Sequence, residues 1–389
     1  SVNRRRMAVL TAFAVSLMLC GCMNRVELKD RTIIRMIGVD TDEEGFVVTM
    51  LQFSPQAKPG EQNSSSAAVV IQTSGRSISE AVSKVSHYNG NEVFLGNSSF
   101  LVVGQEAAQE GLERTLNYFN ANHEVSPELY VAMAQGRAES IIRAKAQEGS
   151  NPTQLKSLVE QGRRNGLLGR PTLRDVMNRL QSNRAEPYLP VLTTVELDGN
   201  EDVLKIVGMA VFRDGRLQDT LSIEQTRGVL WATNELNRAL ITVDFDEEDA
   251  ARASVELKKS RSRVKVQIVR GYPVFHLSIR SQGSIREVSF DRGGGAQVDE
   301  LTEIQNQVAE TIRATVRQTI DRVFFEQKSD VFRYSEFLKK YAPTYWKEHE
   351  KDWDRLIEKS RVEIEVSCQI DHPGLENKHH QIVKMTRSA

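Results

Sequence analysis

A short stretch near the amino terminus carries residues arranged for covalent lipid attachment. Residues 7–19 contain no charge, they follow three arginines at residues 4–6, and they lead into Leu-Cys-Gly-Cys at residues 19–22. A leucine three positions before a cysteine, with a small residue directly before it, is the pattern on which the cysteine sulfur is diacylglycerated and the chain is cut. We therefore predict signal cleavage between Gly21 and Cys22, and a thioether-linked diacylglycerol on Cys22 with acyl chains such as palmitate.

The length of the apolar run supports this prediction over a membrane span. The run has thirteen residues, whereas a spanning helix needs about 20. Cys20 is a rival acceptor, but bulky Met18 and Leu19 precede it. An ordinary secretory signal cut elsewhere, or an amino-terminal core helix, stays open as an alternative. Two acyl chains make a stable anchor, so we expect the protein to act outside the cytoplasm at a membrane face.

The composition excludes some classes of partner. Removal of residues 1–21 leaves 368 residues and changes the formal charge from -1 to -4, because three arginines and no acidic residue are lost. A nearly neutral chain is a poor candidate for nucleic-acid binding, and charge alone would not hold it on an anionic membrane. Only Cys22 and Cys368 remain. A lipidated Cys22 leaves no intramolecular disulfide, so packing must provide stability.

The first half of the mature chain alternates between the two periodicities of secondary structure. Apolar and β-branched runs predict strands at residues 33–38, 46–53, 69–73, 94–103, 129–133 and 191–197. Apolar residues three and four positions apart predict helices at residues 78–85, 106–119, 138–147, 153–160 and 172–180. Ser77 and Glu80 have the spacing of a capping box, and residues 54–66 are predicted to form a mobile loop.

The second half favours antiparallel strands and one long helix. Asp214-Gly215 predicts a tight hairpin between residues 204–212 and 216–221, followed by a helix at residues 223–236. Further strands are predicted at residues 252–258, 264–270, 274–280 and 362–370. Neither Gly nor Pro occurs between Ala296 and Ala342, and the apolar stripe that starts at Val298 predicts a helix of about 30 residues lying across a sheet.

These patterns predict a mixed α+β protein of two to three domains, with a carboxy-terminal antiparallel sheet packed by one long helix. We place the domain boundary near Asp198-Gly199-Asn200. The expected divisions are a signal peptide at 1–21, a mixed α/β domain at 22–198, and a carboxy-terminal region at 199–389. That region comprises a hairpin and helix subdomain at about 199–257, a sheet and long-helix domain at about 258–371, and a flexible tail at 372–389.

One segment is unusually aromatic. Residues 324–353 hold nine of the 25 aromatic residues of the chain. Trp346 and Trp353 are seven positions apart, so they share a helical face, and Lys347, Lys351 and Arg355 lie beside them. This face is a candidate partner interface or lipid contact, and the alternative is that both tryptophans belong to the core.

Motifs for catalysis and for metal or cofactor binding are weak. Gly293-Gly294-Gly295 lacks the Lys-Ser/Thr of a phosphate-binding loop. A metal set of Cys368 with His372, His379 and His380 is disfavoured because the cysteine belongs to a predicted strand and the histidines to an unpatterned tail. The acidic residues 244–249 lack the spacing of a calcium loop. We therefore expect no catalytic residue, no metal and no cofactor.

Four sequence segments together resemble one family. Residues 22–28 (CMNRVEL) are similar to its opening, although Met23 replaces the usual Trp, and Gly38-Val39-Asp40 matches its Gly-x-Asp. Residues 208–217 (GMAVFRDGRL) and 329–356 (SDVFRYSEFLKKYAPTYWKEHEKDWDRL) follow in the family's order, the latter with its Pro343, Trp346-Lys347 and Trp353. The chain thus resembles the C-subunit family of spore germinant receptors, the GerAC-like lipoproteins. The segment at 334–338 departs from it by lacking a glycine.

The resemblance implies a three-domain mixed α/β protein without an enzyme's site. It also implies a lipid-anchored subunit that works with integral membrane A-type and B-type subunits on the outer face of the spore inner membrane. Its role would be receptor assembly and signal coupling in nutrient-triggered spore germination. A solute-binding lipoprotein of an importer is the alternative, and a cell-wall hydrolase comes after it. A solute-binding lipoprotein needs two similar lobes around a cleft, and a hydrolase needs acidic, basic or metal-binding residues at the spacing of an active site. The sequence shows neither pattern.

Overall fold

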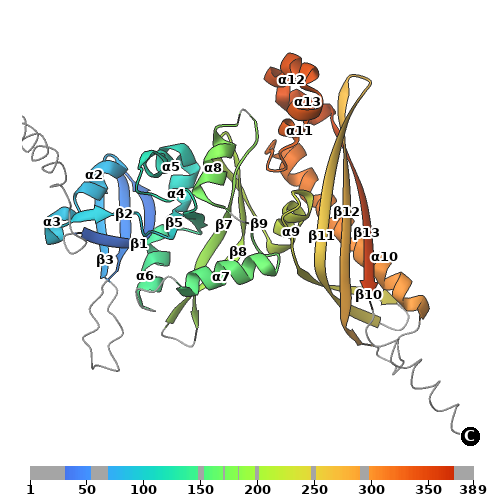
Figure 1. Ribbon diagram of the computed structural model, residues 1–389, viewed down its shortest axis with the longest axis horizontal. Helices are drawn as coiled ribbons and strands as arrows, with labels where there is room; N and C mark the ends of the chain where they lie inside the picture. Colours follow the sequence, from blue (N-terminus) through green and yellow to red (C-terminus); the bar gives the residue numbers. More distant parts are fainter. Residues whose placement is uncertain are drawn as a thin grey trace, which may run out of the picture.

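Two β-sheets lie one beyond the other along the long axis of the molecule (Figure 1). The computed structural model describes residues 31–53, 69–147, 153–169, 171–182, 184–197, 201–246, 251–289 and 298–371. The signal segment, the loop at 54–66, the boundary at 198–200, the glycines at 293–295 and the tail at 372–389 therefore lie outside the described residues. The acidic run at 244–249 is described only up to residue 246.

The first sheet has a parallel centre and antiparallel ends. Its order is β3-β2-β1-β5-β6-β7-β8-β9, and β4 also pairs with β1. Strands β1, β5, β6 and β7 run parallel to one another, whereas β2 and β3 at one end and β8 and β9 at the other are antiparallel additions. The bounds are β1 Arg31–Asp42, β2 Gly45–Gln52, β3 Val69–Gly75, β4 Glu92–Phe94, β5 Phe100–Val103, β6 Tyr130–Ala134, β7 Tyr188–Leu197, β8 Glu201–Arg213 and β9 Arg216–Leu221.

Helices cover both faces of this sheet, as parallel connections require. One face packs against α2 Ile78–Ser83, α4 Gln105–Glu110, α5 Leu112–Ala121 and α8 Leu173–Leu180. The other face packs against α6 Ala138–Gln147 and α7 Thr153–Arg164. A short helix, α3 Ser86–Asn89, follows α2. The bounds predicted for the helix at 138–147 are confirmed, and Ser77 caps α2 by accepting from the N–H of Glu80.

Other predictions in this half need correction. The helix predicted at 106–119 is two helices, because Gly111 has a φ of 130° and interrupts the hydrogen-bond ladder. The strand predicted at 94–103 is likewise two strands, β4 and β5. The hairpin at Asp214-Gly215 is confirmed, with φ values of 51° and 69° that suit a type I′ turn. Strands β7 and β8 pair antiparallel from Tyr188 with Val211 to Leu197 with Glu201. The domain boundary expected near residues 198–200 falls outside the described residues and stays a prediction.

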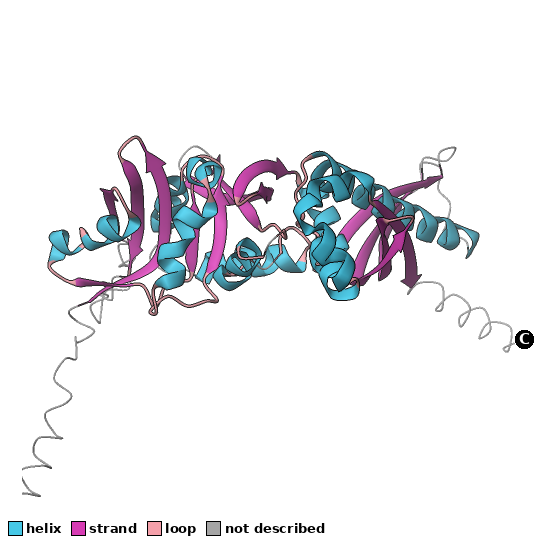
Figure 2. Ribbon diagram, turned by 90° about the horizontal axis from the view of Figure 1, so that it is seen from above, coloured by secondary structure: helices cyan, strands magenta, loops and turns pink. Residues whose placement is uncertain are grey.

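The second sheet has the order β10-β11-β12-β13. Its strands are β10 Ala239–Asp246, β11 Ala251–Val269, β12 Tyr272–Ser289 and β13 Arg361–Asp371. The accompanying helical segments are α9 Ile223–Ala232, α10 Val298–Ile320, the π-helix η2 Asp321–Glu326, α11 Tyr334–Tyr341, α12 Pro343–His349, the 3₁₀ helix η3 Glu350–Asp352 and α13 Trp353–Lys359. Figure 2 shows the helices of this half gathered against its sheet.

The long helix has the predicted role. Helix α10 runs on into η2, and its apolar stripe packs into one core with α9 and the second sheet. The stripe residues Ile304, Val308, Ile312, Val316 and Ile320 are all fully buried. Two details differ from the prediction. The strands predicted at 252–258 and 264–270 are one strand, β11, and β13 runs parallel to β12 because the helices between them return the chain to the same end.

An aromatic cluster closes this core. The ring of Phe324 lies at the centre, 4.9 Å from that of Tyr334, 6.0 Å from that of Trp353 and 6.3 Å from that of Phe275. These rings come from η2, α11, α13 and β12. The aromatic segment therefore holds the carboxy-terminal helices against the sheet.

We predict that Phe324→Ala lowers the free energy of unfolding by about 3–5 kcal/mol, because the cavity left at the centre of the cluster cannot collapse fully. Urea denaturation followed by tryptophan fluorescence measures the loss. Tyr341→Ala is the matched control, since Tyr341 is 56% exposed, and it should cost less than about 1 kcal/mol. Equal losses in the two variants would contradict the central role of Phe324.

Candidate functional site: the joint between the two sheets

The residues selected from the sequence fall into two groups. Gly21 and Cys22 lie outside the described residues. Trp346 and Trp353 are only 5% and 3% exposed, and their rings pack edge to face with centroids 5.4 Å apart. The interpretation of these two side chains as an exposed partner interface is therefore corrected. Trp346 on α12 and Trp353 on α13 both pack into the core of the second sheet, which was the alternative left open.

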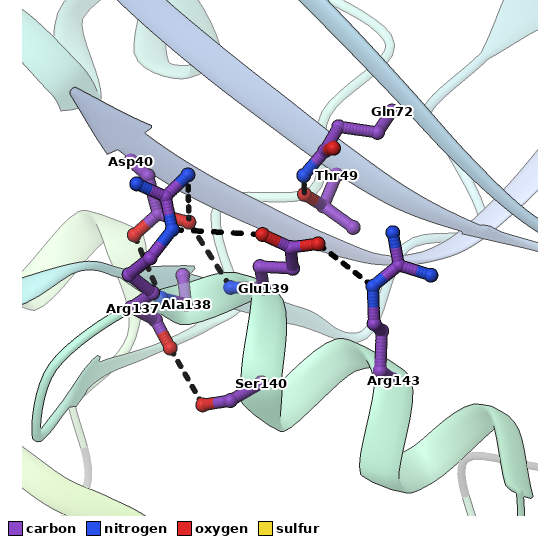
Figure 3. Close-up of polar contacts among 8 residues, drawn as sticks. All are labelled: Asp40, Thr49, Gln72, Arg137, Ala138, Glu139, Ser140 and Arg143. Carbon is purple, nitrogen blue, oxygen red and sulfur yellow. Dashed lines mark hydrogen bonds and ion pairs between the residues drawn. The ribbon is translucent and has the colours of Figure 1, made fainter. Parts of the chain in front are cut away.

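The Asp40 carboxylate of the Gly-x-Asp segment caps a helix. Asp40 is 3% exposed, and its two oxygens accept from the N–H groups of Ala138 and Glu139 at 2.7 and 3.0 Å (Figure 3). Burial raises the pKa of Asp40, while these two N–H groups and Arg137, 3.9 Å away, favour the ionised form. The carboxylate accepts hydrogen bonds from backbone N–H groups in the first turn of α6 that have no partner within the helix, and it holds that helix against β1.

Close packing around Asp40 explains the glycine of the same segment. A Cβ on Gly38 would lie 2.9 Å from the side chain of Ile142 on α6, and a Cβ on Gly104 would lie 2.1 Å from an oxygen of Asp40. Arg143 donates from Nε to the carboxylate of Glu139 at 2.7 Å, and this hydrogen bond lowers the pKa of Glu139. The Gly-x-Asp segment therefore allows α6 to pack closely against β1 and hydrogen-bonds to its amino-terminal turn.

A second polar group joins the two sheets. Arg179 on α8 donates from Nη1 to the carbonyl oxygen of Val331 at 2.9 Å and to that of Glu186 at 3.2 Å. Its Nη2 lies 3.5 Å from Glu235, which also accepts from the hydroxyl of Tyr188. The Arg179 side chain is only 13% exposed. One guanidinium therefore links the layer of the first sheet to the segment that precedes α11.

The carboxyl groups of partly buried Glu186 and fully buried Asp330 complete this joint. Glu186 accepts from the N–H groups of Asp214 at 2.7 Å and Gly215 at 3.4 Å, and its own N–H donates to the carbonyl oxygen of Asp330. Asp330 is fully buried and accepts from the N–H groups of Tyr334 and Ser335, both at 2.8 Å. Burial raises the pKa of Glu186 and that of Asp330 to about 7.

The hydroxyl of Ser329 adds a further link. It donates to the carbonyl oxygen of Phe212 at the end of β8. The hairpin of the first sheet, the segment at 184–190 and the segment at 329–335 are therefore held by side-chain contacts to backbone groups. Such contacts can hold two bodies in one relative position. We call the contacts of Arg179, Glu186, Ser329 and Asp330 the polar joint.

The polar joint has only partial signals in the sequence. Ser329 and Asp330 open the segment at 329–356 that resembles the family, and Glu186 directly precedes Pro187. Arg179 reads in the sequence as one charge on the exposed side of an amphipathic helix. Its partner carbonyl at Val331 lies 152 positions along the chain.

The Cys368 thiol and the side chains that could bind a metal ion do not form a further site among the described residues. The thiol of Cys368 is half-buried, and burial raises its pKa to about 11, which leaves almost no thiolate near neutral pH. Among the described residues, no three His, Cys, Asp or Glu side chains are grouped so that they would hold a metal ion. None of the described helices has the length and apolar character needed to cross a membrane.

Comparison with known families accounts for both halves of this architecture. The family described as "Spore germination protein N-terminal domain" matches residues 24–194, and "Spore germination B3/ GerAC like, C-terminal" matches residues 207–374. The chain belongs to the GerAC-like family, the C subunits of spore germinant receptors.

Relatives in this GerAC-like family align over nearly their whole length. Spore germination protein B3 of Bacillus subtilis (strain 168) is 21% identical over 94% of this chain and 97% of its own. Spore germination protein KC of the same organism is 21% identical over 97% of both chains, and GerQC of Bacillus cereus is 20% identical over 93% of this chain and 97% of its own. The crystal structure of the GerBC protein shares the fold, with a TM-score of 0.57 and 20% identity over 86% of this chain and 96% of that chain.

We predict that Arg179→Ala lowers the free energy of unfolding by about 2–4 kcal/mol, because two carbonyl oxygens and the Glu235 carboxylate lose a buried donor. The control is Arg174→Ala on the same helix. Arg174 forms a surface ion pair with Glu128, and its side chain is 54% exposed. Loss of this pair should cost less than about 1 kcal/mol of stability. Chemical denaturation compares the two. A loss no larger than that of the control would argue against the joint.

The raised pKa of Glu186 predicts a pH dependence. Between the ordinary glutamate pKa of 4.5 and the folded value of about 7, the unfolded chain releases the proton while the folded chain keeps it. Rising pH therefore destabilises the native state across this range. Glu186→Gln removes this contribution, so the variant should gain stability relative to the wild type between about pH 5 and pH 8. Urea denaturation across this range tests it, and a pH-independent difference would contradict the raised pKa.

Proposed function

We propose that this chain is a lipid-anchored, non-catalytic subunit of a nutrient receptor required for spore germination. The observation that carries the proposal is the match of both halves of the chain to the GerAC-like family, over nearly the whole length of relatives named as spore germination proteins. The subunit acts in receptor assembly and signal coupling at the outer face of the spore inner membrane. Its partners are the integral membrane A-type and B-type receptor subunits.

The predicted anchor would hold the first sheet close to the membrane. Strand β1 begins at Arg31, nine positions after Cys22. A fully extended chain of this length spans at most about 30 Å. Two acyl chains on Cys22 would bind the bilayer stably, whereas one would exchange. In this arrangement the first sheet lies near the lipid, and the second sheet extends away from the point of attachment.

The polar joint supports a role in coupling. A subunit that relays a change between partners must transmit displacement from one of its ends to the other. The side chains of Arg179 and Ser329 bind backbone groups across the two sheets, and the N–H of Glu186 donates to the carbonyl oxygen of Asp330. A movement of one sheet is therefore carried to the other rather than absorbed in a linker. The proposed function thus assigns the joint a mechanical task and no chemical step.

The anchor is tested with Cys22→Ala, expressed in a sporulating host that lacks the native protein. We expect loss of membrane retention in spores together with loss of nutrient-triggered germination, while germination by non-nutrient agents persists. Cys368→Ala is the matched control, because the half-buried Cys368 thiol carries no predicted lipid, and it should retain both properties.

Two outcomes would contradict parts of the proposal separately. Persistence of retention and germination in Cys22→Ala would show that Cys22 is not the required anchor. A host without the native protein that still responds to every nutrient would refute the germination role itself.

A further inference from the structure

A large groove opens between the two halves of the molecule. Its volume is about 1050 Å³, and three parts of the chain form its walls. Helix α7 contributes Arg163 and Arg164 from its last turn, and the segment after α9 contributes Asn234, Asn237 and Arg238. The remaining wall belongs to β11 and β12 of the second sheet. The groove is separate from the polar joint.

The lining of this groove is cationic. Nine of its fourteen lining residues are Lys or Arg, and none is Asp or Glu. The six on the strands are Lys258, Lys259, Arg261, Arg263, Lys265 and Arg280. Within the part of the chain that the structure describes, none of the nine forms an ion pair. The other lining residues are serine and asparagine, so the groove offers many hydrogen-bond donors and no acidic group of its own.

Positive side chains occur at every second residue along one part of β11, so they lie on the same face of the strand. Lys259, Arg261, Arg263 and Lys265 occupy every second position, and all four are exposed. Alternate residues of a strand lie about 6.6 Å apart on one face, so these four cations extend over about 20 Å. Arg280 on β12 lies directly opposite Arg261 in the register. A single phosphate or carboxylate is too small to meet this row, whereas an extended chain with acidic side chains at alternate positions has the same spacing.

The same part of β11 lacks a second strand neighbour among the described residues. Strand β10 pairs with β11 only as far as Leu257, so the following residues of β11 have β12 as their single strand neighbour among the described residues. The N–H of Ser262 donates instead to the side chain of Asn234 at 2.7 Å. Positive side chains along an edge repel a second copy of it. They attract an acidic strand, which adds main-chain hydrogen bonds at the edge.

We propose that this basic groove binds an extended, acidic segment of a partner polypeptide. A bilayer fits it less well, because the groove is concave and its lining contains no apolar or aromatic side chain that would enter lipid. The inference rests on the groove alone and holds whether or not Cys22 is lipidated.

The test measures binding of a fluorescein-labelled peptide of alternating Glu and Thr to the purified full chain in a non-ionic detergent. We expect saturable binding that weakens as salt is added. The peptide of alternating Gln and Thr should not bind. The groove variant combines Arg261→Gln, Arg263→Gln and Lys265→Gln, and it should weaken binding about tenfold, since each exposed charge contact contributes roughly twofold.

A variant with the same change in net charge serves as the control. Lys347→Gln, Lys351→Gln and Arg355→Gln alter three exposed residues outside the groove, and this combination should leave the affinity within about twofold. Thermal unfolding of both variants checks that their folds are intact.

The remaining outcomes overturn the proposal. Equal weakening in both triple variants would mean that the peptide senses net charge and not the groove. Full competition by millimolar inorganic phosphate would assign the groove to a small anion. Binding of phosphatidylglycerol vesicles that depends on the three groove residues, without binding of the acidic peptide, would assign it to a membrane surface. Absence of any peptide binding would refute the proposal directly.

Discussion

The guanidinium of Arg179 lies at the centre of the polar joint between the two sheets. Its planar fork reaches two carbonyl oxygens and a carboxylate from a position that is almost closed to solvent. A lysine at this position would offer a single point charge and would not span these acceptors. The carboxyl groups of partly buried Glu186 and buried Asp330 then bind the turn at 214–215 and the start of α11 respectively. The polar joint accordingly orders a hairpin of one sheet and a helix of the other at the same time.

Much of the fold follows from local pattern. The stripe of α10, the bounds of α6 and the turn at Asp214-Gly215 are all encoded within a few neighbouring residues, and all are confirmed. The predictions that failed depend on tertiary contacts. Strand β11 was divided because residues 259–263 carry charge and hydroxyl groups on both faces, although β12 pairs with them throughout. Trp346 and Trp353 were placed on one face of a single helix, whereas they belong to α12 and α13, and packing against the sheet turns both side chains inward.

The functional features likewise differ in whether local sequence or tertiary contacts determine them. The Gly-x-Asp segment was identified by resemblance, and its physical meaning, a buried cap that docks α6, required coordinates. Overall composition argued against strong electrostatic binding, because the formal charge of the chain is -1. That average conceals the groove, where three distant parts of the chain bring nine cations together without an acidic residue. Net charge describes a whole molecule, whereas binding depends on the local field.

The contacts of Arg179 have a consequence for how this family is compared. The guanidinium binds the main-chain oxygens of residues 331 and 186, and a main-chain oxygen is present whatever side chain stands there. The side chain at residue 331, which is fully buried, is therefore constrained by core packing and not by this contact. Methods that infer contacts from correlated substitutions will find no partner for the arginine at Val331, even though this contact crosses between the two sheets.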